Sequence, residues 1–205
     1  MRHFASPADT RSALFATGVG SASNAIRVCN ACRALQPFDA RVTFYELFDE
    51  KKSFDVKNVV LNVKFKQMQK VLHPDKFATA SERERELSSD YSSLVNKAYK
   101  VLVDPYERGL YLLCLHGKEV KEDSDIQLTP DFLMEVMEFN EAIADNKVSQ
   151  ETLKTLKVEN DTKIEKIIKE ISTAFEFTDF DSAKLLLAKL KFYNNAAEKI
   201  KEKLQ

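Results

Sequence analysis

A proline stands between two helical patterns near the middle of this chain, and that break constrains the fold more than any other feature. In the stretch Val-Leu-His-Pro-Asp-Lys-Phe, residues 71–77, Pro74 cannot continue a helix and biases His73 towards an extended backbone. On both sides of the break, apolar residues recur at the three- and four-residue spacing of a buried helix face. They are Leu61, Phe65, Met68 and Leu72 before the break, and Leu87, Tyr91, Leu94, Ala98 and Val101 after it. The pattern predicts a helix over 56–72, a loop, and a second helix that begins near Ser81 and ends at Asp104.

The remaining segments also carry helix signals, and none carries a strand signal of any length. Thr43 is placed to cap a short helix, and Asp55 to cap the helix that leads to the proline break. A helix over 107–116 is expected to stop at Gly117. Three further helices are predicted over 130–145, over 150–177, and from 178–181 to the end. Since the chain has only 4 Gly in 205 residues, we predict an all-α protein whose second half is an antiparallel three-helix bundle.

Five parts are expected along the chain: a tail (1–28), a short cysteine-containing segment (29–40), a first helical domain (41–117), a polar linker (118–128) and the bundle (129–205). The tail carries Arg2, Arg11 and Arg27 against the single acid Asp9, and it is rich in Ser, Ala and Thr. Such a composition is typical of an organelle transit peptide. We therefore expect import into the mitochondrial matrix. A plain disordered N-terminus and a cytosolic pool are the alternatives.

Charge and hydrophobicity exclude two classes of partner. Lys and Arg number 31 and Asp and Glu number 32, so no overall field favours nucleic acid. No apolar run approaches the roughly 20 residues that a membrane-spanning helix needs. We expect neither nucleic acid nor a membrane as a partner.

The cysteines are too few for a structural framework. Cys29, Cys32 and Cys114 make an odd count, which argues against paired disulfides. Cys29 and Cys32 form one C-x-x-C pair, whereas a structural zinc site takes four ligands. We expect no required cofactor. Zinc at this incomplete site, or a redox protein built on the pair, are the alternatives.

One face of the helix before the break is basic. Opposite its buried stripe stand Asn62, Lys66, Lys70 and then His73, and Lys57 and Lys64 add positive charge nearby. Such a stripe suits an acidic partner surface; an ordinary solvated lysine face is the alternative. A catalytic His73–Asp75 dyad is disfavoured, because no motif supplies a nucleophile and Pro74 is expected to splay the two side chains.

The whole arrangement from 41 to 116 resembles a J-domain. The resemblance rests on "TFYELF", "LHPDKF", "NKAYKVL" and "DPYERGLYL", which follow in that family's order and spacing. It implies an antiparallel helical hairpin with a His-Pro-Asp loop, and a protein that stimulates ATP hydrolysis by a DnaK-type chaperone without being an enzyme. By the resemblance, His73, Pro74 and Asp75 are required for stimulation, and Lys66 and Lys70 dock on the chaperone. Many J-domains carry a basic residue at the position of Asn62, which leaves that contact in doubt.

The predicted helix over 130–145 carries more apolar residues than one core face needs. Its core stripe is complete with Phe132, Val136, Phe139 and Ile143. A second patch, of Leu133, Met134 and Met137, is flanked by Glu138 and Glu141, and the last helix leaves Leu185 and Phe192 off its main stripe, with Lys191 adjacent. Extra core and a partner surface are the two interpretations.

The segments "DFLMEVMEFNEAI" and "AKLKFYNNAAEKIKEKL" are similar to the scaffold-binding segments of HscB-type co-chaperones of iron–sulfur cluster assembly. The resemblance spans 29–205. It implies that an IscU-type scaffold contacts Leu133, Met134, Met137, Glu138, Glu141 and Phe192, with Lys191 as a further candidate. Animal mitochondrial forms commonly bind zinc through two C-x-x-C pairs, and this chain shows one.

The sequence therefore predicts an adaptor that brings the scaffold to a mitochondrial DnaK-type chaperone. A J-protein with a different client is the main alternative, and a homodimer is an alternative assembly.

Overall fold

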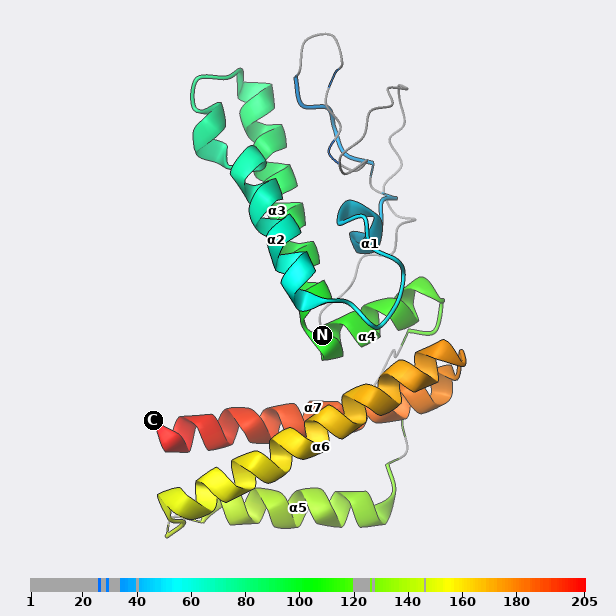
Figure 1. The fold of residues 1–205 in the computed structure, drawn as a ribbon, viewed down its shortest axis with the longest axis vertical. Coiled ribbons are helices and arrows are strands. Elements are labelled where there is room, and N and C mark those ends of the chain that lie inside the picture. The colour runs from blue at the N-terminus through cyan, green and yellow to red at the C-terminus, as the bar shows by residue number, and fades with distance from the viewer. Residues whose placement is uncertain are drawn as a thin grey trace. The chain divides into compact units, whose positions relative to one another are not determined.

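In the computed structural model, the residues described are 26, 29, 34–39, 41–119, 126, 128–145 and 147–205. They form helices and no strand. The chain divides into two compact units, one ending at Tyr111 and the other beginning at Leu112. The α-helices, labelled in Figure 1, are α1 (Phe44–Leu47), α2 (Asn58–Leu72), α3 (Glu82–Val103), α4 (Pro105–Leu115), α5 (Pro130–Ala144), α6 (Gln150–Glu176) and α7 (Phe180–Leu204). A 3-10 helix, η1 (Pro74–Phe77), lies between α2 and α3.

The first unit is built on an antiparallel hairpin of α2 and α3 (Figure 1), which contact each other along their apolar faces. Leu61 and Leu72 from α2 and Tyr91 and Leu102 from α3 are fully buried. Phe65 of α2, half-buried, stacks on Tyr99 of α3 with ring centroids 4.1 Å apart. These contacts use the apolar periodicity that predicts the two helices.

The helix α1 closes one side of this hairpin. Thr43 and Glu46 form a reciprocal capping box at its start, as the expected cap at Thr43 requires. The backbone N–H of Phe44 donates to the hydroxyl of Tyr111 over 3.0 Å, and the two rings stack with centroids 4.5 Å apart. Arg108 is buried, donates to the carbonyl of Leu102 and lies over the ring of Phe54.

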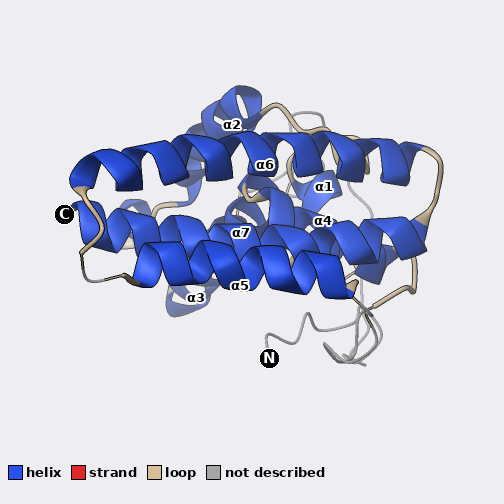
Figure 2. Ribbon diagram, turned by 90° about the horizontal axis from the view of Figure 1, so that it is seen from below, coloured by secondary structure: helices blue, strands red, loops and turns tan. Residues whose placement is uncertain are grey.

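The second unit is a three-helix bundle in which α6 and α5 both pack against α7 (Figure 2). One core cluster joins Phe139 and Ile143 of α5 to Ala196 and Ile200 of α7, with Leu156 of α6 packed against it. Each connection starts its helix with a side-chain cap: Thr129 for α5, Ser149 for α6 and Asp179 for α7.

The predicted all-α fold, with a J-domain hairpin followed by a three-helix bundle, is confirmed. The prediction that Asp55 caps α2 is wrong. The helix starts at Asn58, and Lys57 at the cap position makes no side-chain cap hydrogen bond. Asp55 stands too far before the first free N–H groups of α2, and its own backbone N–H donates to the hydroxyl oxygen of Ser53 over 3.2 Å. The helix predicted over 107–116 starts earlier, at Pro105, because Pro is favoured in a first helical turn.

Candidate functional site

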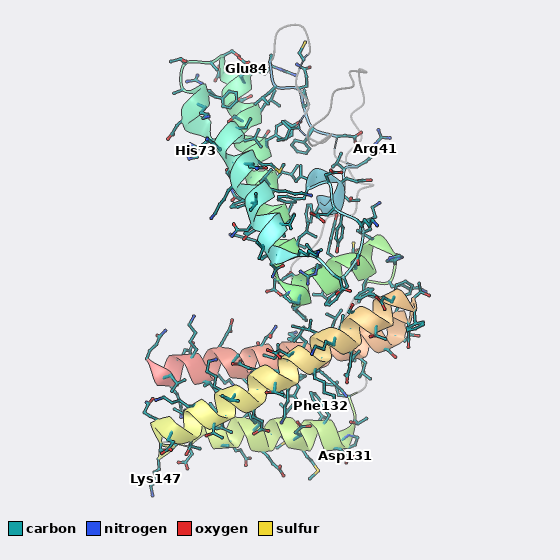
Figure 3. The ribbon with its side chains drawn as sticks, viewed as in Figure 1. Arg41, His73, Glu84, Asp131, Phe132 and Lys147 are labelled. Atoms are coloured by element: carbon teal, nitrogen blue, oxygen red, sulfur yellow. The ribbon has the colours of Figure 1, made fainter. Side chains whose placement is uncertain are left out.

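His73 ends α2 and organises the loop that follows it (Figure 3). Its backbone is extended, at φ −60° and ψ 128°. The backbone N–H of Asp75 donates to His73 Nδ1 over 3.3 Å, and that of Lys76 donates to the His73 carbonyl over 2.9 Å. Since Nδ1 accepts this bond, the neutral ring carries its proton on Nε2, away from the turn.

The prediction that Pro74 splays His73 and Asp75 is wrong. His73 Nδ1 lies 3.4 Å from Asp75 Oδ2. The short turn of η1 explains this, because it brings residue 75 back over the imidazole instead of carrying it away. Both side chains remain exposed. A buried acid–base pair would have a shielded, low-dielectric setting, whereas this exposed pair is suited to contact with another surface.

Two serines of α3, the buried Ser88 and the half-buried Ser92, hold the end of α2. Ser88 is fully buried and its hydroxyl donates to the carbonyl of Leu72 over 2.8 Å. One turn away, the hydroxyl of Ser92 donates to the side-chain oxygen of Gln69 over 3.1 Å. No role is assigned to these two serines in the sequence analysis. The spacing of 88 and 92 on the side of α3 that faces α2 is the signal that could have suggested their structural role.

Lys66 and Lys70 are both exposed on α2, whereas Asn62 is half-buried. Neither lysine forms an ion pair with a carboxylate of the described residues. The face therefore presents two uncompensated ammonium groups on a helix that contains no acidic residue. Two such groups in line with His73 suit an acidic counter-surface.

Lys64 does not add free positive charge near this basic face, contrary to the prediction. Its Nζ donates to the carbonyls of Phe48 and Asp49, each over 2.9 Å, and pairs with Glu50 Oε1 at 2.7 Å. The side chain satisfies acceptors at the end of α1 and so fastens α2 to that turn. Its charge is used inside the first unit.

The second candidate surface lies on α5. Its predicted core stripe is buried, and Figure 3 shows Phe132 between α5 and the neighbouring helices. Met134 and Met137 are 60% and 61% exposed, and Leu133 is exposed beside them. Glu138 and Glu141 are also exposed on α5. The three apolar side chains are therefore surplus to the core, which favours the partner-surface interpretation over extra core.

Phe192 of α7 is half-buried because it packs edge-on against Phe132 of α5, with ring centroids 5.9 Å apart. The structure thereby joins Phe192 to the residue that precedes Leu133. Lys189 also contacts Phe132, with its Nζ 5.1 Å from the ring centroid. Leu185 and Lys191 of α7 are half-buried as well.

A polar network that the sequence does not suggest fixes α5 to the bundle. The hydroxyl of Tyr193 donates to Glu135 Oε1 over 2.8 Å, and Lys163 Nζ lies 2.9 Å from the same oxygen. The hydrogen bond from Lys163, followed by that from Tyr193, holds the pKa of Glu135 below its ordinary value although desolvation opposes this. Burial first, and then the bond to Glu135, raise the pKa of Tyr193 to about 12. Charged and aromatic groups from three helices thus meet at one point.

The cysteine segment offers no complete metal site in the described part of the chain. Cys29 is half-buried, and its N–H donates to the carbonyl of Ala34 over 2.8 Å. Cys32 and the predicted tail lie outside the described residues, apart from Ile26. Among the residues that are described, no three ligating side chains gather around a common point.

None of the described helices combines the length and the apolar character that crossing a membrane requires.

Known proteins match this chain over most of its length. Residues 128–201 match the family described as the HSCB C-terminal oligomerisation domain. The human iron-sulfur cluster co-chaperone protein HscB is 40% identical over 175 residues, which make up 85% of this chain and 74% of the human protein. The crystal structure of human co-chaperone protein HscB has a TM-score of 0.83 at 38% identity and covers 92% of this chain and 94% of its own. Chaperone HscB from Vibrio cholerae has a TM-score of 0.70 at 29% identity, over 78% of this chain and 96% of its own.

Proposed function

This chain belongs to the HscB family of iron–sulfur cluster co-chaperones, and from that premise we propose that it binds a scaffold protein of IscU type and delivers it to a DnaK-type chaperone whose ATPase it stimulates. The chain itself is not the enzyme in this scheme. The iron–sulfur cluster is cargo on the scaffold. We propose the mitochondrial matrix as the compartment, on the transit-like composition of the tail.

The chaperone is proposed to dock on α2 and the loop that follows it. Lys66 and Lys70 supply long-range attraction for an acidic surface, which speeds encounter and sets orientation. His73, Pro74 and Asp75 then contact the chaperone at the place where its ATPase responds. The turn that holds His73 Nδ1 against the Asp75 N–H supports this role, because it fixes the imidazole before binding.

The scaffold is proposed to bind the α5 surface. Leu133, Met134 and Met137 would supply apolar contact area, and Phe192 would continue it from α7. Glu138 and Glu141 would form a charged rim that selects a basic partner patch. The exposure of three neighbouring large apolar side chains beside a complete core stripe is the observation that carries the proposal.

Coupling needs no chemistry within this chain. A chaperone held by the first unit and a scaffold held by the second are tethered to one molecule. The second encounter therefore takes place at a raised effective concentration. ATP hydrolysis by the chaperone would then secure its grip on the scaffold and favour release of the cluster to acceptors.

The test is a pair of variants that should fail in opposite ways. His73→Gln is expected to abolish ATPase stimulation and to leave scaffold affinity intact; His116→Gln, which changes another exposed histidine, is its matched control. Leu133→Ala with Met137→Ala should weaken scaffold binding by at least about tenfold and leave stimulation in the absence of scaffold intact. Val158→Ala, at an exposed position of α6, is the matched control.

Stimulation that survives His73→Gln would contradict the chaperone half of the proposal. Failure of the wild-type chain to bind an IscU-type scaffold would point instead to a J-protein with a different client.

A further inference from the structure

Large apolar side chains that remain exposed in the described part of the chain gather on two helices. One group is the α5 surface. The other is on α2 and consists of Val59, Val60, Val63 and Val71; Val158 and Phe177 are isolated positions elsewhere. The α5 group has a role in the proposed function, whereas the valines of α2 do not.

The valines of α2 continue the line of its two free lysines. Val59, Val63, Lys66 and Lys70 follow one another at i, i+4, i+7 and i+11, the spacing of one helix face. Val59 is 80% exposed and Val63 is 51% exposed. The buried residues Leu61, Met68 and Leu72 belong to the opposite face. The solvent face of α2 is therefore apolar at its start and basic towards His73.

The first unit gains nothing evident from these valines. Exposed helix positions are normally filled by Glu, Lys, Gln or Ala, because β-branched side chains lose rotamer freedom in a helix. Exposed valines also bury little surface within their own fold. The first turn of α2 has neither an acidic residue nor a side-chain cap that would offset this weakness. Neither helix propensity nor core packing accounts for Val59 and Val63.

We propose that Val59 and Val63 are part of the docking surface for the DnaK-type chaperone, which would then present an apolar patch next to its acidic one. This inference rests on the proposed function and deepens it. Continuity with Lys66 and Lys70 on one helix face identifies the occupant, since a protein that covers the lysines also covers the residues one and two turns before them. The scaffold is assigned to a surface of the other unit.

A second copy of this chain fits the same face less well. Packing two α2 helices through their valines would bring lysines of one copy near lysines of the other, because Lys57 precedes the patch and Lys66 and Lys70 follow it. The helix α2 contains no acidic residue to compensate them. Like charges across an interface disfavour that assembly.

The test uses a double variant that carries both Val59→Gln and Val63→Gln. Its control is Val158→Gln, which changes a valine on α6 that is 66% exposed. ATP hydrolysis by a DnaK-type chaperone is titrated with each variant. The double variant should need about tenfold more protein for half-maximal stimulation, which corresponds to about 1.4 kcal/mol, and should reach the same maximum. Val158→Gln should match the wild-type chain.

Salt dependence separates the two kinds of contact. Stimulation by Lys66→Ala with Lys70→Ala should lose part of its sensitivity to ionic strength, whereas the valine variant should keep the wild-type salt slope. Since Gln favours helix at least as well as Val, the valine variant should melt no earlier than the wild type. A weaker interaction could not then be attributed to unfolding.

The outcomes distinguish this inference from the proposed function. If the wild-type chain stimulates the chaperone, His73→Gln does not, and the valine variant equals the wild type, the inference is wrong and the function stands. If the wild-type chain fails to stimulate the chaperone, both the inference and the chaperone half of the proposed function are wrong. If the valine variant keeps its stimulation but has an altered monomer–dimer equilibrium in sedimentation, the valines contact a second copy. If the valine variant loses affinity for the scaffold, the valines contact the scaffold. Either result overturns the proposal.

Discussion

Replacing Ser88 by Ala is expected to loosen the end of α2 at the point where the His73 loop begins. Ser88 is fully buried, and its hydroxyl donates to the Leu72 carbonyl over 2.8 Å. Leu72 is the last residue of α2, and the last carbonyls of a helix have no partner within it. Alanine would leave this buried carbonyl unsatisfied. The expected loss in the free energy of unfolding is about 1–3 kcal/mol.

Calorimetry of the whole chain measures this loss. For a domain of the size of the first unit, each kcal/mol lowers the melting temperature by about 4–8 °C, so the melting temperature of the first unit should fall by roughly 4–24 °C. The transition of the bundle should not move. Because His73 follows Leu72 directly, the variant should also need more protein for half-maximal stimulation of the chaperone, while its scaffold affinity stays unchanged.

Ser89→Ala is the matched control, since Ser89 is the next residue of α3 and is exposed. It should change neither the melting temperature nor the stimulation. Equal melting curves for Ser88→Ala and Ser89→Ala would refute the reasoning, because the buried hydrogen bond would then contribute nothing to the position of the loop.

Three further predictions follow from the polar contacts and the cysteine pair. Lys64→Met should lower the melting temperature of the first unit, because it removes three acceptor contacts at the end of α1, yet leave the salt dependence of chaperone stimulation unchanged. The pKa of Glu135 is lowered in the folded chain from its ordinary value of 4.5. The contribution of Glu135 to stability is therefore present above that pH and is lost as pH falls through the folded pKa. In acid titrations followed by circular dichroism, Glu135→Gln should be less stable than the wild type near neutral pH and should lose less stability on acidification. Elemental analysis should find well under one zinc per chain, since Cys29 and Cys32 supply two of the four ligands that a structural site needs, and chelation should not alter stimulation.

Much of the fold follows from periodicity and from residues with special backbone preferences. The buried positions Leu61, Met68 and Leu72 repeat at helical spacing, and Pro74 cannot continue α2, so the helix ends before it. The caps at Thr43 and Ser81 are equally local, because each depends on a side chain and the N–H groups within its next turn. Such features require no knowledge of what packs against the helix.

The features that the sequence did not predict depend on partners far away in the chain. Lys64 has the same local signature as Lys66, and only the turn after α1 shows that its charge is already used. Asn160 is fully buried and donates to the backbone carbonyl of Tyr193 over 3.0 Å, which no pattern within α6 suggests. The prediction that Pro74 separates the side chains of His73 and Asp75 failed for a similar reason, since the hydrogen bond from the Asp75 N–H to His73 depends on the actual backbone angles.

Both proposed surfaces share one physical arrangement. The contact residues are exposed on a helix, and buried or half-buried polar side chains of neighbouring helices anchor that helix through hydrogen bonds. Ser88 ties the end of α2, and Tyr193 and Lys163 tie α5 through Glu135. A helix fixed in this way loses little conformational entropy when a partner binds, so more of the contact energy contributes to affinity. Substituting side chains that touch neither partner should therefore still change the affinity of this chain for the chaperone or for the scaffold. Substituting the exposed contact residues should change affinity without changing stability, whereas substituting the supporting residues should change both. Measurements of stability and of affinity therefore separate contact residues from supporting residues.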